Sequence, residues 1–206
     1  MKTISTLLII TSFSLSFSSN ISAQVNTQIK ALNTNSTVKT ELNTKQLEYL
    51  EVQANKRIKQ FAGQLKSALV GAIQKDGFAS AVKVCKEQAP EIAQSVSNNG
   101  WTLARTSLKT RNAENAADKW EVEKLQAFDK QFKEGVPPNQ LSAYSINEKS
   151  YRYMKAIPTG QLCLACHGSK VEASLKATID ESYPHDKAIE YTLEDIRGAF
   201  TLRKSL

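Results

Sequence analysis

The chain has 206 residues, with 27 lysines and arginines, 20 aspartates and glutamates, and a formal net charge of +7. The basic residues are spread out and interleaved with acidic ones, as in Lys119-Trp120-Glu121-Val122-Glu123-Lys124. Nucleic-acid binding is not expected, because the sequence has no basic block of the kind that follows a phosphate backbone. The length suits one domain with a hydrophobic core, and the dispersed charge suits a solvated surface.

The N-terminal segment, residues 1–23, has the pattern of a secretory signal peptide. Met1-Lys2 gives a positive start, an uncharged apolar and hydroxyl-rich run follows, and Ile21-Ser22-Ala23 provides small residues for cleavage. We therefore predict export to the periplasm with cleavage near Ala23. An uncleaved N-terminal anchor is the alternative, although the run is short for a membrane span.

The mature chain is predicted to start with a disordered spacer, residues 24–43, which is rich in Asn, Thr and Ser. The folded domain is then expected over residues 44–206. Apolar residues recur every three or four positions along residues 47–76, which indicates one long amphipathic helix. A second helix starts at Phe78, and Pro90 predicts a kink or short break just after Cys85.

The rest of the chain mixes predicted strands and helices. The patterns predict a strand over 101–107, a polar loop over 109–117, a helix over 118–132, a hairpin or two strands over 141–157, a short helix from residue 163 to about 177, a turn at 183–185 and a strand over 198–206. Asp118 and Glu121 have the spacing of a capping box at the start of their helix. Two helices followed by an antiparallel sheet with intervening helices indicate an α+β domain.

The motif Cys163-Leu164-Ala165-Cys166-His167 has the C-x-x-C-H spacing through which c-type haem is attached. Two thiols one helical turn apart can add to the two vinyl groups on one porphyrin edge, and the adjacent imidazole can bind the iron. A structural disulfide, half of a zinc site and a thioredoxin-like redox pair are the alternatives. Export agrees with covalent haem, so we predict one haem c bound through Cys163 and Cys166.

The second axial ligand has several candidates. The sequence has three cysteines, so haem attachment leaves Cys85 without a partner in an oxidising compartment. His185 is the only histidine besides His167, and Met154 is the only methionine outside the predicted signal peptide. Residue types alone favour His185 over Met154 and Cys85, and an open coordination position remains a further alternative.

Four blocks of residues occur in order around this motif. They are Ala81–Cys85 with Ala89–Ala93; Arg105-Thr106-Ser107 with Arg111-Asn112, Asn115, Asp118 and Trp120-Glu121; the motif with Gly168; and Tyr183-Pro184, Asp186-Lys187-Ala188, Tyr191 and Asp195–Ala199. With these blocks, residues 61–206 resemble the single-haem, PAS-like c-type cytochrome family first described from cyanobacteria. That family also supplies periplasmic sensor domains of histidine kinases and chemoreceptors. Glu190 departs from the family pattern, which has a glycine at this position.

The resemblance implies a PAS-like α+β fold, an antiparallel sheet with long N-terminal helices. It also implies that the iron has a histidine on one side and a cysteine on the other, which by position are His167 and Cys85. This assignment replaces the ranking from residue types, and it also accounts for the unpaired thiol.

Two arginines are candidate partners of the haem propionates, because the guanidinium fork matches a carboxylate. These are Arg105 and Arg111. Surface ion pairs with Glu114 or Glu121 are the alternative role for both arginines.

A thiolate ligand stabilises ferric over ferrous iron, so reduction should weaken its bond and release the helix that carries Cys85. Such a device suits a redox or gas-responsive sensor whose partner is a redox protein or a membrane-bound signalling protein. The alternative is a periplasmic electron-transfer cytochrome c. No enzymatic activity is expected, since a weak peroxidase would have only His185 as a candidate acid or base.

Overall fold

The structure, a computed structural model, describes residues 42–206. The predicted signal peptide and all but the last two residues of the predicted spacer lie outside the described residues. No helix within 42–206 is both long enough and apolar enough to span a bilayer.

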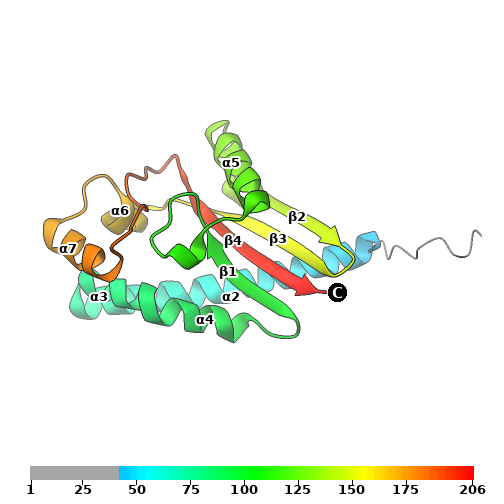
Figure 1. Ribbon diagram of the computed structural model, residues 1–206, viewed down its shortest axis with the longest axis horizontal. Coiled ribbons are helices and arrows are strands. Elements are labelled where there is room, and N and C mark those ends of the chain that lie inside the picture. Colours follow the sequence, from blue (N-terminus) through cyan, green and yellow to red (C-terminus); the bar gives the residue numbers. More distant parts are fainter. Residues whose placement is uncertain (1–41) are drawn as a thin grey trace, which may run out of the picture. The chain divides into compact units, whose positions relative to one another are not determined.

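A four-stranded antiparallel sheet in the order β1-β4-β3-β2 forms the centre of the domain (Figure 1). The strands are β1 Trp101–Thr106, β2 Ser142–Asn147, β3 Ser150–Pro158 and β4 Ile196–Ser205. As predicted, β2 and β3 form a hairpin and the chain ends in a strand, β4. The structure places β4 between β1 and β3. The expected α+β fold, with long helices before an antiparallel sheet, is confirmed.

The N-terminal helices form one long rod and one interrupted helix. They are α2 Thr44–Asp76, α3 Phe78–Lys83, a π-helical turn Val84–Gln88 and α4 Ala89–Val96. The irregularity predicted near Cys85 is therefore present, and it takes the form of a π-helical turn that contains this cysteine. Pro90 lies in the first turn of α4, directly after the π-helical turn, and its missing N–H interrupts the helical hydrogen-bond ladder at this point.

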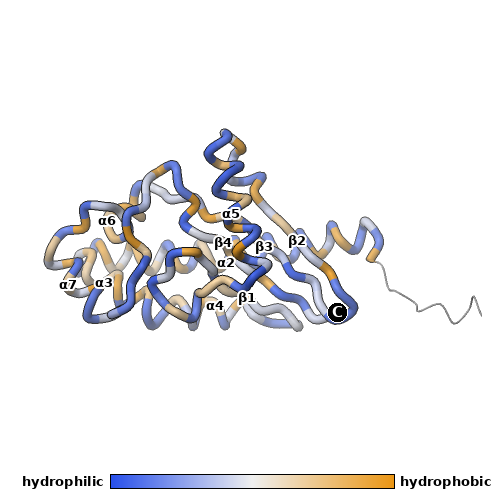
Figure 2. The backbone as a smooth tube through the Cα atoms, turned by 45° about the horizontal axis from the view of Figure 1, so that its top comes forward, coloured by the Kyte–Doolittle hydropathy of each residue, from blue (hydrophilic) through white to orange (hydrophobic). Residues whose placement is uncertain are grey.

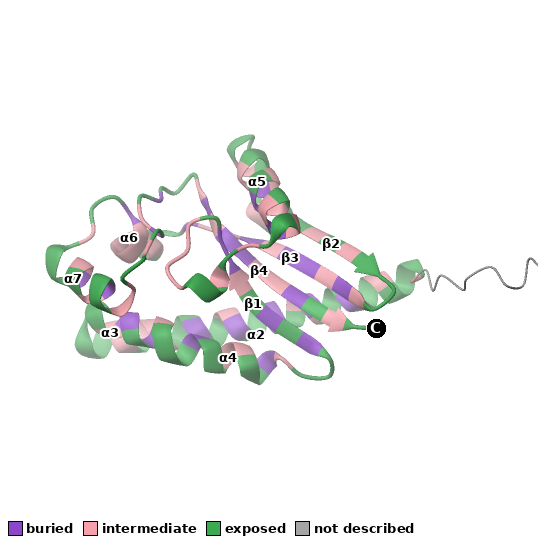
Figure 3. Ribbon diagram, viewed as in Figure 1, coloured by how far each residue is buried: buried purple, intermediate pink, exposed green. Residues whose placement is uncertain are grey.

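Helices α2 and α4 pack on one face of the sheet. The buried cluster between them and the strands contains Leu50, Ala54, Ile58, Phe61, Leu65, Val84, Ala89, Val96, Trp101, Leu103, Tyr151, Tyr153 and Leu202. Hydrophobic and hydrophilic residues alternate along these helices (Figure 2), and buried residues concentrate in β3 and β4 and on the inner helix faces (Figure 3). Burial of this apolar stripe holds the N-terminal helices on the sheet.

Helix α5, Lys119–Lys133, contributes to the core on the other face of the sheet. Its N-terminus has the predicted capping box between Asp118 and Glu121. The buried residues of this second cluster are Leu125, Phe128, Leu141, Met154, Ala156, Ile196 and Ala199. Short 3-10 turns at Ala113–Asn115 and Pro138–Gln140 precede and follow α5.

The single helix predicted from residue 163 to about Ala177 is wrong, because the structure has two helices. These are α6 Gln161–His167 and α7 Ala173–Ser182. Gly168 is extended at the end of α6, where a Cβ would lie 2.7 Å from the Leu164 carbonyl oxygen. Glu172 then caps a new helix by accepting from the N–H groups of Ser174 and Leu175. The apolar face of α7 packs on Val82 of α3.

Candidate functional site

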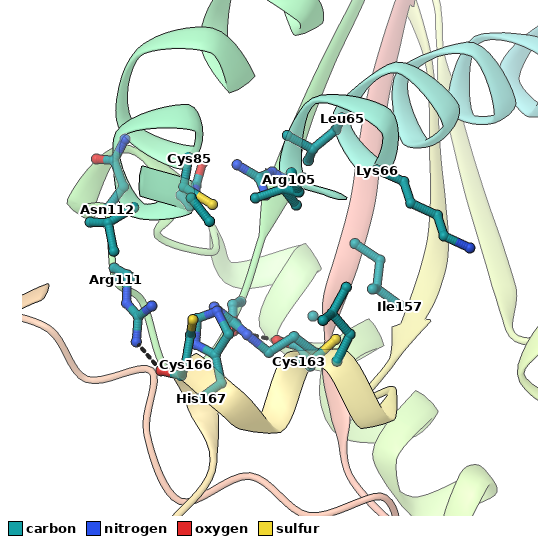
Figure 4. A pocket seen from close by; sticks show the side chains of 18 of the residues that line it. Leu65, Lys66, Cys85, Arg105, Arg111, Asn112, Ile157, Cys163, Cys166 and His167 are labelled. Carbon is teal, nitrogen blue, oxygen red and sulfur yellow. Dashed lines mark hydrogen bonds between the residues drawn. The ribbon is translucent and has the colours of Figure 1, made fainter. Parts of the chain in front are cut away.

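A cavity of about 460 Å³ lies between the N-terminal helices, α6 and the adjoining ends of the central strands (Figure 4). Its volume is within the range of small-molecule and cofactor pockets. Apolar side chains form much of the wall: Phe61, Leu65, Leu69, Ile73, Phe78, Val82, Ile157, Leu162 and Phe200. The six predicted site residues all line it: Cys85, Arg105, Arg111, Cys163, Cys166 and His167.

Helix α6 presents the motif cysteines to the cavity. Cys163 and Cys166 are one helical turn apart, and both side chains face the cavity in Figure 4. Both are free, partly buried thiols, and burial raises the pKa of the Cys166 thiol. The backbone N–H of Gly160 donates to the sulfur of Cys163 over 3.4 Å. The spacing and direction of the two thiols suit attachment along one edge of a flat ligand.

His167 is held so that one ring nitrogen is used and the other is available. Its Nδ1 lies 2.7 Å from the carbonyl oxygen of Ala188, which requires Nδ1–H as the donor. Burial, together with the nearby positive charges of Arg197 and Arg111, lowers the pKa of His167 to about 2. The imidazole is therefore neutral, and the lone pair of Nε2 is free to bind a metal.

Cys85 faces His167 across the cavity (Figure 4). The π-helical turn that carries it is a local widening of the helix, a feature that is frequent at functional sites. Burial raises the pKa of the Cys85 thiol, while the charges of Arg105, Arg111 and Arg197 oppose this increase. The surrounding arginines therefore lower the cost of forming the thiolate, the form in which cysteine binds metals.

The other two candidates for a second ligand lie elsewhere. Met154 is fully buried in the cluster under α5, and His185 is exposed in the segment after α7. Neither residue lines the cavity. Of the three candidates, the structure therefore brings only Cys85 together with His167.

Arg111 and Arg105 differ in their partners. The guanidinium of Arg111 is 2.9 Å from Asp186 Oδ2 and donates to the carbonyl oxygen of Cys166 over 2.6 Å. Its acidic partner is therefore neither Glu114 nor Glu121. Arg105 lies over the ring of Phe61 at 5.6 Å and has no carboxylate of the described residues within ion-pair distance.

Arg197 is a further cavity residue, for which the sequence predicted no role at the site. It donates to Ser107 Oγ over 3.2 Å and lies over the ring of Tyr191, and no carboxylate within residues 42–206 pairs with it. Burial lowers the pKa of Arg197 and of Arg105. The sequence feature beside Arg197 that could have drawn notice is the glycine that follows it. A Cβ at Gly198 would be 2.4 Å from the Thr106 carbonyl oxygen, so β4 must approach β1 closely at this point.

The donor set can be tested against the alternatives from the motif. No three His, Cys, Asp or Glu side chains of the described domain are grouped to hold a metal ion, which disfavours a structural zinc site with four protein ligands. The cavity instead offers two thiols on one helix, an imidazole and a thiol on opposite sides, apolar walls and two arginines without carboxylate partners. These residues fit a haem attached through cysteines.

Fold and site together define an α+β domain with a cofactor cavity lined by cysteine, histidine and arginine. The family model described as Tll0287-like matches residues 15–205, so the chain belongs to the Tll0287-like family, as the sequence blocks indicated. The crystal structure of the cyanobacterial haem protein Tll0287 has the same fold: the TM-score is 0.52 at 24% identity, covering 78% of this chain and 94% of that one. No curated protein matches the chain. Glu190, where the family pattern has glycine, has a φ of 59°.

Proposed function

We propose that this chain binds one haem c covalently through Cys163 and Cys166, with His167 and Cys85 as the axial ligands of the iron. The observation that carries the proposal is the placement of Cys85 opposite His167, in the same cavity as the two motif thiols. The membership of the family agrees with it, since Tll0287 itself is described as a haem protein.

The residues around the cavity have separate tasks in this proposal. His167 binds through Nε2 because its Nδ1–H is engaged by Ala188. Arg105 and Arg197 bind the propionates, since they have no carboxylate partner of their own among the described residues. Arg111 adds positive charge to the same wall, while its hydrogen bonds go to protein groups.

Bound haem would supply one-electron chemistry and a position for a small gas. We propose that the exported protein acts in the periplasm as a redox or gas-responsive sensor. Cys85 supports this role because it lies on an irregular turn between α3 and α4, and α3 packs on α7. A movement of α3 after release of the thiol would therefore be transmitted to α7. A redox protein or a membrane-bound signalling protein would read the change, and electron transfer remains the alternative role.

Covalent attachment is tested by the mass of the mature protein and by extraction. We expect a mass increased by one haem, and haem that stays with the protein in acidified organic solvent. The double variant Cys163→Ala/Cys166→Ala should lose this covalent haem completely, because both bonds depend on these sulfurs. Extraction of the haem from the unmodified protein would contradict the proposal.

The sensor and carrier roles differ in what happens to Cys85 on reduction. Ferrous iron holds a partly desolvated thiolate less strongly, so a sensor should bind carbon monoxide when reduced. Hydrogen exchange in residues 78–90 should also become faster than in the oxidised protein. A carrier keeps both ligands in both states, so unchanged exchange and no carbon monoxide adduct would favour electron transfer.

A further inference from the structure

Arg111, at the wall of the cavity, forms an ion pair with Asp186 where α6 meets the segment between α7 and β4. Their side chains are only 10% and 4% exposed, and their closest atoms are 2.9 Å apart. Burial of two charges is costly unless further hydrogen bonds compensate them. The partners of the pair therefore indicate what it is used for.

Both residues of this ion pair are connected by hydrogen bonds to the proposed haem-binding motif. Arg111 Nη2 donates to the carbonyl oxygen of Cys166 over 2.6 Å and reaches that of Ala188 at 3.4 Å. Asp186 Oδ1 accepts the backbone N–H of Ala188 over 2.8 Å. The carbonyl of Ala188 is the acceptor for His167 Nδ1. The pair thus fixes both the end of the helix that carries His167 and the acceptor that orients its ring.

The position of Arg111 also suits the end of α6. The carbonyls of the last helical turn have no partner within the helix, and the C-terminal end of the helix dipole favours a cation. Cys166 lies in that last turn, so the guanidinium satisfies one of these carbonyls. One arginine therefore contacts the attachment helix and the residues that orient its histidine.

Backbone hydrogen bonds hold the same segment on both sides of the ion pair. The N–H of Lys187 donates to the carbonyl of Thr110 over 2.8 Å, and that of Tyr191 donates to the carbonyl of His167 over 2.9 Å. Residues 187–193 have no helix or strand of their own. The position of the Ala188 carbonyl therefore depends on these contacts and on the ion pair, with no regular element to fix it.

We propose that Arg111 and Asp186 are positioning residues for the proposed iron ligand His167, acting through the carbonyls of Cys166 and Ala188. This inference rests on the proposed haem function. It assigns Arg111 a task other than binding a propionate, and it assigns Asp186 a task that the sequence did not suggest. Outer partners of a histidine ligand commonly fix its tautomer and orientation.

The test compares the ferric protein with the double variant Arg111→Met/Asp186→Asn by electron paramagnetic resonance. The double variant removes both charges, so the net charge near the iron does not change. If the pair positions His167, the g values should shift or split into several low-spin species, because the ring plane is no longer fixed. A pair that acts only through its charges predicts unchanged g values, and this result would overturn the proposal.

The single variant Asp186→Asn keeps the test valid if the double variant does not fold. Asp186 uses one carboxylate oxygen for Arg111 and the other for Ala188, and asparagine retains only one oxygen. We expect a smaller g-value shift in the same direction, and unchanged g values in this folded variant would also overturn the proposal. Lys176→Met/Asp180→Asn is the matched control on α7, where the pair is 43% and 51% exposed. Absence of haem from the unmodified protein would instead overturn the proposed function.

Discussion

The arginine under α5 and the arginines at the cavity differ in how their charges are compensated. Under α5, Arg152 lies 3.0 Å from Glu121 and 2.7 Å from Asp118, and its guanidinium lies over the ring of Trp120. At the cavity, Arg105 and Arg197 have aromatic rings and a hydroxyl nearby but no carboxylate within residues 42–206.

This difference indicates which of the two regions is suited to bind an anionic ligand. A buried charge that is not paired is costly, so a protein that keeps two such arginines gains from an anion that reaches them. The α5 region supplies its own carboxylates and needs nothing further. The cavity leaves room for two carboxylates from outside, which is what the propionates of a haem would bring.

Sulfur side chains show the same contrast. Met154 is 0% exposed in the cluster under α5, where it fills the core between strand and helix. Cys85 lies at the wall of the cavity, on a π-helical turn that interrupts the regular α-helix. The sulfur of Met154 therefore contributes to core packing, while the sulfur of Cys85 is available to bind a metal.

The largest expected effect comes from removing the cavity sulfur. Cys85→Ala should change the Soret band and abolish the near-infrared charge-transfer band of the ferric protein, because the iron loses its thiolate. The absorption spectrum of the purified variant is the measurement. His185→Ala and Met154→Leu are the matched controls and should leave both bands nearly unchanged. A spectrum that changes in His185→Ala and not in Cys85→Ala would make His185 the better candidate for the ligand.

Sequence patterns predicted the local elements of this fold where the signal lies within one turn or one helix. The capping box of Asp118 and Glu121, the hairpin and the irregularity before Pro90 are all present. The helix after the haem motif was predicted wrongly. Its apolar pattern continues past Gly168, while the extended backbone at this glycine ends the helix. Helical periodicity does not report such a break.

Placement in space explains the remaining differences between the predicted and observed site. Residue types alone ranked His185 first as second ligand, yet this histidine is exposed and does not line the cavity. Arg111 was expected to be available for a propionate, but Asp186, 75 residues further along the chain, lies beside it. Neither the position of His185 nor the partner of Arg111 could be predicted from the sequence, because each depends on how distant segments meet in the folded chain.

The next largest effect is expected under α5. Arg152→Met leaves the carboxylate of Glu121 buried without its cation, which should lower the free energy of unfolding by about 3–5 kcal/mol. Chemical denaturation followed by circular dichroism measures this loss. The midpoint potential of the remaining folded protein should not change, since the pair lies in the α5 region. If the variant had an altered midpoint potential and unchanged stability, Arg152 would act on the haem and not on the stability of the fold, which contradicts the comparison.

The smallest effect on stability is expected at the cavity. Arg197→Met removes a guanidinium that has no carboxylate partner in the described domain, so in the haem-free protein no buried carboxylate is left behind, and the free energy of unfolding of that form should change by less than about 1 kcal/mol. The midpoint potential should fall, because a nearby positive charge favours ferrous over ferric iron. Arg105→Met should lower it in the same way, and redox titration with optical detection measures both. If both variants kept the unmodified potential while Arg152→Met shifted it, the cavity arginines would have no role toward the haem.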